Sequence, residues 1–175
     1  MRYQEILTDD FNNGPGLRVS LWTVGCPHRC PGCHNPHLFD KTGGKEFTEE
    51  TMEKLLKALR EDVPRDFSVL GGEPLAPYNV HGVKEICSRV KKTYPEISIW
   101  LWSGYTLREI MSHPDRQAVL EYIDVLVEGR FIERYKQEGL PFRGSTNQHI
   151  YDLNASRLSG QPICIDKHAE DLMKF

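Results

Sequence analysis

The chain has 175 residues, of which 39% are hydrophobic and 27% charged, as in a soluble globular domain with its own core. Its formal net charge of -3 at pH 7 creates no overall positive field that would attract a nucleic-acid backbone. No apolar run approaches the ~20 residues of a membrane-spanning helix, and residues 1–5 lack the apolar stretch of a secretory signal. We therefore expect one domain over residues 1–175, in the cytoplasm, with neither a membrane nor a nucleic acid as partner.

Short apolar runs alternate with helical patterns along the chain. Strands are predicted at residues 17–24, 67–70, 97–102 and 123–127. Between them, Thr48 is predicted as a helix N-cap, residues 83–90 carry the apolar face of a second helix, and Thr106 and Glu109 form a capping box that opens a third. Strands followed by helices in this order predict βαβ units, an α/β fold and a mostly parallel sheet.

Polar and glycine-rich segments follow directly after the predicted strands. These segments are Gly25-Cys26, Gly71-Gly72-Glu73, Ser103-Gly104 and Glu128-Gly129-Arg130. The carboxyl ends of parallel strands lie at one edge of a sheet, where α/β proteins place their sites. We therefore expect these four segments to converge on one functional site.

The first of these segments begins a cysteine-rich loop. Cys26, Cys30 and Cys33 follow the spacing C-x3-C-x2-C, and the prolines and glycines between positions 25 and 36 exclude a regular helix. Three of five cysteines clustered in this way indicate a metal or cluster site in place of a disulfide framework. A structural zinc site and an electron-transfer [4Fe-4S] cluster each need four ligands, so three thiolates would leave one iron open to an external molecule.

The spacing alone leaves two other interpretations open. The fourth ligand of a zinc site could be His28, His34 or His37. A four-cysteine cluster could be completed by Cys87 or Cys164. However, Cys87 lies on the apolar face of a predicted helix and Cys164 lies in the apolar segment 162–165, so we expect both to be buried core residues.

Two motifs together resemble a known superfamily. The C-x3-C-x2-C loop is similar to the signature of radical S-adenosylmethionine enzymes, and Gly71-Gly72-Glu73-Pro74 resembles their second motif. The continuation His34-Asn35-Pro36 resembles glycyl-radical-enzyme activases. Further segments resemble activating proteins of anaerobic (class III) ribonucleotide reductases; these segments are 13–18, 102–105, 124–131 and 143–148. The resemblance covers residues ~1 to 155 and leaves 156–175 as a C-terminal extension.

The resemblance implies a partial, open (β/α) barrel of about five or six mostly parallel strands, smaller than a complete barrel of ~250 residues. It implies that Cys26, Cys30 and Cys33 hold a [4Fe-4S] cluster, whose remaining iron binds S-adenosylmethionine and cleaves it reductively to a 5′-deoxyadenosyl radical. Gly32 stands where many members carry an aromatic residue, which leaves open which side chain contacts the adenine.

The resemblance also implies roles for the residues around the cluster. Gly32, Cys33 and His34 would contact the adenine mainly through backbone atoms. Gly71 and Gly72 would let the backbone approach the methionine moiety, and Glu73 would accept hydrogen bonds from its ammonium group. Ser103 would bind the ligand's carboxylate or ribose, or else serve as a turn serine. Arg130 would pair with the ligand's carboxylate or with Glu128.

The partner implied by the resemblance is the large catalytic subunit of the anaerobic reductase, on which a glycyl radical would form. Residues 131–148 are a candidate docking surface, with an ordinary surface loop as the alternative. The implied electron donor is a reduced flavodoxin. Three other functions remain open: an activase of the pyruvate formate-lyase type, a non-catalytic zinc or iron–sulfur module, and a radical enzyme acting on a small molecule.

Overall fold

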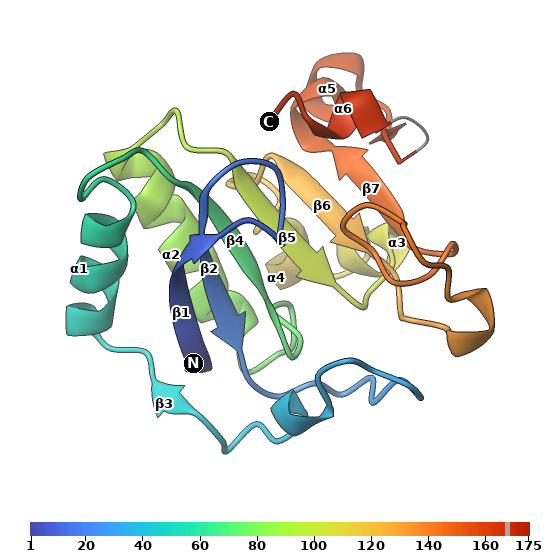
Figure 1. The fold of residues 1–175 in the computed structure, drawn as a ribbon, viewed down its shortest axis with the longest axis horizontal. Coiled ribbons are helices and arrows are strands. Elements are labelled where there is room, and N and C mark those ends of the chain that lie inside the picture. Colours follow the sequence, from blue (N-terminus) through green and yellow to red (C-terminus); the bar gives the residue numbers. More distant parts are fainter. Residues whose placement is uncertain (167–168) are drawn as a thin grey trace.

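The computed structural model describes residues 1–166 and 169–175. Its main feature is an eight-stranded sheet in the order β3-β1-β2-β4-β5-β6-β7-β8 (Figure 1). The strands are β1 Arg2–Asp10, β2 Arg18–Thr23, β3 Lys45–Glu46, β4 Asp66–Gly71, β5 Ile99–Ser103, β6 Val125–Glu128, β7 His149–Asp152 and β8 Ile163–Cys164. None of the helices in these residues is long and apolar enough to cross a membrane.

The centre of the sheet is parallel and its two sides are antiparallel. Strands β2, β4, β5 and β6 pair in parallel, at the places where the sequence predicts strands. On the outer sides, β1 pairs antiparallel with β2 and β3, and β7 pairs antiparallel with β6 and β8. The α/β class is therefore confirmed. The prediction of five or six mostly parallel strands is wrong in number and direction, and a partial barrel is not confirmed.

The additional strands have a physical explanation. Only residues 11–17 connect β1 to β2. A connection of this length closes an antiparallel hairpin, whereas parallel neighbours need a crossover of a dozen residues or more. Strand β1 is largely exposed, so its apolar residues are too few to reveal a strand from the sequence alone.

In the described residues, six helices and two 3-10 helices accompany the sheet, and in Figure 1 α2 and α4 lie behind its central strands. Thr48 caps α1 by accepting a hydrogen bond from the Thr51 amide, as predicted. The predicted capping box of Thr106 and Glu109 opens α3. The helices are α1 Glu49–Ala58, α2 Val80–Thr93, α3 Leu107–Met111, α4 Pro114–Gln117, α5 Leu153–Ser159 and α6 Ala169–Leu172, and the 3-10 helices are η1 Pro36–Leu38 and η2 Glu133–Tyr135.

Side chains from β5 and β6 enter two separate hydrophobic clusters. Leu101 and Leu126 belong to the larger cluster, which includes apolar residues of α1 and α2. Trp100 and Val127 belong to a smaller cluster that includes Leu172 of α6. Because successive side chains of a strand point to opposite faces, both faces of the central sheet are buried. Each fully buried residue of this size contributes roughly 1.5–3 kcal/mol.

A buried arginine ties β2 to β4. The Arg18 guanidinium is fully buried and donates to the Ser68 hydroxyl at 2.7 Å and to the Phe67 carbonyl at 2.7 Å. Burial lowers the pKa of Arg18 to about 10, so the side chain stays charged at neutral pH, and Asp66 lies 3.6 Å away. A Cβ atom on Gly14 would lie 2.8 Å from the Arg18 side chain, so this loop needs a glycine there.

Candidate functional site

The cysteine loop begins three residues after β2, at the carboxyl edge of the parallel strands. The Gly25 amide donates to the Leu38 carbonyl at 2.8 Å, and the Cys26 amide donates to the Phe39 carbonyl at 3.3 Å. Leu38 of η1 is buried and anchors the far end of the loop. In Figure 1 this segment runs along the lower edge of the sheet, beyond the arrowhead of β2.

All three thiols of the loop are free and half-buried. Burial raises the pKa of the Cys26 thiol, and burial followed by the nearby Cys33 raises the pKa of Cys30. The Asn35 amide donates to the Cys33 sulfur at 3.4 Å, so one backbone donor already faces a thiol. Hydrogen bonds to sulfur are a recurrent feature of iron–sulfur sites.

The three thiols are not gathered around one point as the ligands of a single ion would be. Ligands of one tetrahedral zinc ion stand roughly 3–4 Å apart, because each lies about 2.0–2.3 Å from the metal. Among the residues that the structure describes, the three cysteines do not form a group whose ligand atoms lie within 4.8 Å of one another. In an iron–sulfur cluster each thiolate binds its own iron, and the thiolates therefore stand farther apart.

Both ring nitrogens of His28 form hydrogen bonds with other residues. Its Nε2 lies 2.9 Å from Glu73 Oε2, and its Nδ1 lies 3.2 Å from Arg130 Nε. A carboxylate only accepts and a guanidinium only donates, so Nε2 carries the proton and Nδ1 is the acceptor. Because both ring nitrogens of His28 have hydrogen-bond partners, this arrangement disfavours His28 as a fourth zinc ligand.

The segment Gly71-Gly72-Glu73 interlocks with the start of the cysteine loop. The Gly72 amide donates to the Thr23 carbonyl and the Glu73 amide donates to the Gly25 carbonyl, both at 2.8 Å. A Cβ atom on Gly72 would lie 2.5 Å from the Gly25 oxygen, and one on Gly71 would collide with Thr23 backbone atoms. Gly71 also has φ +113°, which favours glycine. The two motifs therefore form one structural unit.

The Glu73 carboxylate is fully buried and saturated with protein donors. Oε1 accepts from the Leu75 amide at 2.9 Å and from the Ser103 hydroxyl at 2.8 Å. Oε2 accepts from the Gly104 amide at 2.7 Å in addition to His28. A methionine ammonium would have to displace one of these donors. The Ser103 hydroxyl also accepts a hydrogen bond from the Tyr105 amide at 3.1 Å. This bond is typical of a turn serine, the alternative to ligand binding that the sequence analysis gave for Ser103.

Arg130 pairs with Glu109 of α3, in place of Glu128. Its Nη2 lies 2.9 Å from Glu109 Oε1, and Glu128 instead accepts from the Leu107 amide at 3.1 Å. Burial acts to raise the pKa of Glu109, but hydrogen bonds from Arg130 and Thr106 outweigh it and lower the pKa to about 2. The capping-box pattern locates Glu109 at a helix start, but only the fold brings Arg130 to it.

Gly32 lies under the segment that follows β6. A Cβ atom there would be 3.0 Å from the Glu133 carboxylate and 3.3 Å from the Phe131 ring. The Phe131 ring also lies 5.9 Å from the His34 ring, centroid to centroid. Gly32 has φ +72°, so a side chain would be both crowded and strained. The Phe131 ring thus lies beside the cysteine loop at Gly32 and His34.

Comparisons with known proteins identify a family for the chain. The family described as "4Fe-4S single cluster domain" matches residues 12–151. A Vibrio cholerae protein is 40% identical over 86% of this chain and 97% of its own length. Proteins of Escherichia coli K12 and Enterobacteria phage T4 are 35% and 36% identical, over 87% and 86% of this chain and 99% and 94% of their own lengths. All three are named anaerobic ribonucleoside-triphosphate reductase-activating protein.

The chain belongs to this family of activating proteins. Its cofactors are therefore a [4Fe-4S] cluster and, as the activity of such activases requires, S-adenosylmethionine. The cysteine loop and the Gly71-Gly72-Glu73 segment both lie within the matched residues 12–151. The matched region ends before α5, β8 and α6, so the C-terminal elements lie outside the part that defines the cluster domain of this activating protein family.

The two remaining cysteines differ from each other in burial. Cys87 on α2 is fully buried, as predicted. The prediction that Cys164 is a core cysteine is wrong, because Cys164 is exposed. The apolar segment 162–165 forms a strand of only two residues at the edge of the sheet, where alternate side chains face solvent. Four strands lie between β2 and β8 in the sheet order, so Cys164 is remote from the cysteine loop.

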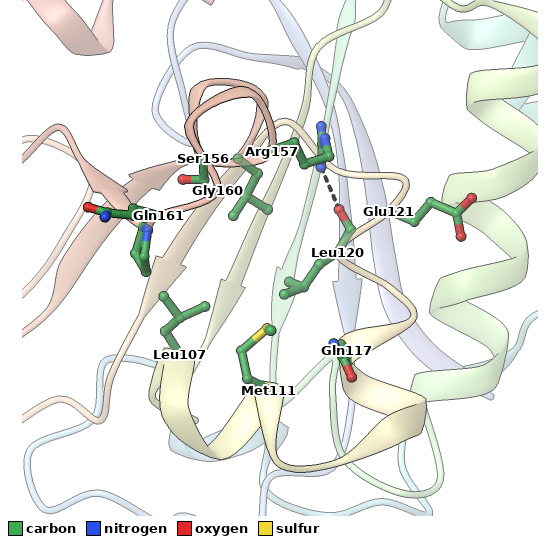
Figure 2. Close-up of a pocket in the computed structure, with 11 residues that line it drawn as sticks. Leu107, Met111, Gln117, Leu120, Glu121, Ser156, Arg157, Gly160 and Gln161 are labelled. Atoms are coloured by element: carbon green, nitrogen blue, oxygen red, sulfur yellow. Dashed lines mark hydrogen bonds between the residues drawn. The ribbon is translucent and has the colours of Figure 1, made fainter.

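A separate cavity of about 410 Å³ lies between α3, α4 and α5 (Figure 2). Leu107, Met111 and Leu120 give it an apolar lining, and the Arg157 guanidinium at its rim donates to the Leu120 carbonyl at 2.8 Å. Its described lining residues include none from the cysteine loop or from residues 71–74. The cavity is therefore lined by residues other than those of the two motifs.

Proposed function

We propose that the chain activates the anaerobic ribonucleoside-triphosphate reductase by generating a glycyl radical on its large catalytic subunit. The observation that carries this proposal is the interlocking of the cysteine loop with residues 71–73 at one sheet edge. It brings three half-buried thiols beside an ordered polar network, in a chain of the activating family. The proposed cluster ligands are Cys26, Cys30 and Cys33.

When bound, the cluster supplies the electron for reductive cleavage of S-adenosylmethionine. The chain's own residues bind and orient the two cofactors. Gly32, Cys33 and His34 offer loop backbone atoms to the adenine, and the Phe131 ring stands next to them. Gly71 and Gly72 keep the end of β4 free of side chains next to Thr23 and Gly25, just before Cys26.

Glu73 and Ser103 act in this proposal mainly by positioning. The buried carboxylate of Glu73 holds His28, which lies between two cluster ligands, and Ser103 holds Glu73. Arg130, which is 43% exposed, has the charge to bind the ligand's carboxylate if it releases Glu109. Ordered groups of this kind keep the reacting atoms in a fixed geometry and so raise the rate of the bond-breaking step.

The proposed docking surface for the reductase is residues 131–148, which connect β6 to β7 beside the cysteine loop (Figure 1). Tyr135 on η2 is 41% exposed there. The contact of Phe131 with His34 joins this surface to the loop, so a partner glycine bound here would lie close to the cofactor. We propose a reduced flavodoxin as donor, a cytoplasmic location and a single domain over residues 1–175.

The test is anaerobic mixing of reduced protein, S-adenosylmethionine and the reductase subunit, followed by electron paramagnetic resonance. We expect a glycyl doublet with the wild type, and its loss with Cys26→Ala, Cys30→Ala or Cys33→Ala. Cys87→Ala is the matched control and should retain both the cluster and the signal. A doublet with a pyruvate formate-lyase-type enzyme in place of the reductase would overturn the partner assignment. Zinc without sulfide in anaerobically purified protein would overturn the proposal that the chain carries out radical chemistry at a [4Fe-4S] cluster.

A further inference from the structure

A second group of possible metal ligands lies on β7 and the C-terminal extension. It consists of His149 at the start of β7, Cys164 on β8 and Asp166 just beyond it. Their ligand atoms all lie within 4.8 Å of one another, and they are the only such group of three in the described part of the chain. Because β7 and β8 pair antiparallel, residues distant in sequence meet here.

The donor set suits a transition-metal ion. It offers an imidazole nitrogen, a thiol sulfur and a carboxylate oxygen, all of which bind Zn²⁺. A tetrahedral ion holds its ligands roughly 3–4 Å apart, so the group needs only small side-chain movements to close around one. Three protein ligands would leave the fourth position to water. Hard ions such as Mg²⁺ prefer oxygen ligands and fit this mixture less well.

Asp166 is held in place for such a role. Its side chain is only 9% exposed, His149 Nδ1 lies 2.8 Å from Oδ2, and Arg143 Nη1 lies 2.6 Å from the same oxygen. Arg143 is fixed in turn by the Gln148 and Asp166 carbonyls, both at 3.0 Å. A carboxylate offers lone pairs on two oxygens, so it can keep Arg143 while it binds an ion. Carboxylates that bind a metal ion directly are usually hydrogen-bonded in turn, as Asp166 is to Arg143.

We propose that His149, Cys164 and Asp166 bind one divalent zinc-type ion that fastens the C-terminal extension to β7. Only two residue pairs, Tyr151 with Cys164 and Asp152 with Ile163, join β8 to β7. An ion linking the two strands would strengthen this short contact. Through Arg143 it would also fix the segment 131–148 beside the cysteine loop. This site is independent of the cluster and of the proposed radical reaction.

The experiment uses the full chain with Cys26, Cys30 and Cys33 all replaced by alanine, so that the cysteine loop binds no metal. Zn²⁺ and, in parallel, Co²⁺ are titrated into this variant. We expect one ion per chain, a thiolate-to-cobalt charge-transfer band and a higher melting temperature with Zn²⁺. Adding Cys164→Ala should weaken binding at least tenfold and abolish the band. Adding His149→Ala should weaken binding to a similar extent but leave the band at saturating Co²⁺.

Cys87→Ala in the same background is the control and should change neither affinity nor band. His149 and Cys164 are exposed, and circular dichroism of both variants checks that they fold. The proposal is overturned if the triple variant retains no zinc after dialysis, or if Cys164→Ala leaves the affinity unchanged. It is equally overturned if the wild-type protein, with its cluster loaded, takes up no zinc beyond its iron. In those cases His149, Asp166 and Arg143 form an ion network only.

Discussion

His28 and Glu73 are joined by a hydrogen bond of 2.9 Å, although 45 positions separate them in the sequence. His28 lies between two cysteines of the loop, and Glu73 ends the glycine-rich segment after β4. The histidine side chain is 5% exposed and the glutamate side chain is fully buried. This bond links the two motifs through their side chains, in addition to the backbone hydrogen bond from the Glu73 amide to the Gly25 carbonyl.

Glu73→Gln tests this link directly. Each carboxylate oxygen of Glu73 accepts from two donors. Either orientation of the glutamine side-chain amide therefore places its NH₂ group against N–H or O–H donors. We expect a loss of about 1–3 kcal/mol in the free energy of unfolding, measured by urea denaturation of the cluster-free protein. Glu138→Gln at an exposed position is the control and should change little. Equal stability of the two variants would contradict the role given to Glu73.

Two substitutions separate the bonds of His28. Glutamine can place a donor near the position of Nε2 and so keep the hydrogen bond to Glu73. Asparagine can reach only the position of Nδ1 and so keeps the hydrogen bond from Arg130. Because Glu73 is buried and Arg130 is 43% exposed, the hydrogen bond to Glu73 should contribute more to the free energy of unfolding than the bond from Arg130. We expect His28→Asn to be less stable than His28→Gln by about 1 kcal/mol, and to cleave S-adenosylmethionine more slowly. The reverse order would make Arg130 the main partner.

Gly72→Ala tests the close contact between the two motifs. The new Cβ would meet the Gly25 oxygen at 2.5 Å, the carbon at 2.9 Å and the nitrogen at 3.0 Å, and backbone atoms cannot rotate away. Overpacking of this kind costs about 1–3 kcal/mol. We expect reduced stability and, because Gly25 precedes Cys26, less iron and sulfide after reconstitution. Gly43→Ala is the matched control, since its Cβ would be 3.4 Å from its nearest neighbour. Similar losses at both positions would argue against a specific contact.

The Glu109–Arg130 pair predicts a dependence of stability on pH. The pKa of Glu109 falls from 4.5 to about 2 on folding, so its charge stabilises the folded state fully above pH 4.5. This contribution declines as the pH falls from 4.5 towards 2. Glu109→Gln keeps a capping-box residue but removes the charge.

The variant should therefore be less stable than the wild type at pH 6, by no more than about 1 kcal/mol because the pair is largely exposed. The difference should shrink as the pH falls below 4.5. Thermal unfolding at a series of pH values measures it. A difference that grows on acidification would have the wrong sign for this pair.

The sequence by itself determined the chemistry of the site and the centre of the fold. Ligand type and spacing are local properties, so the cysteine loop and residues 71–74 could be read directly. The same holds for the caps at Thr48 and Thr106, which depend on bonds to residues three positions away. The four parallel strands carry enough apolar residues to be recognised from their pattern.

Only the tertiary structure decided which side chains meet. Arg130 contacts His28 across 102 positions, and Glu73 contacts Ser103 across 30, and no local pattern encodes such pairs. The exposure of Cys164 depends on β8 lying at the edge of the sheet, whereas its apolar neighbours suggested burial. Residue types thus fix which bonds are chemically possible, and the long-range arrangement of strands and loops selects the bonds that form.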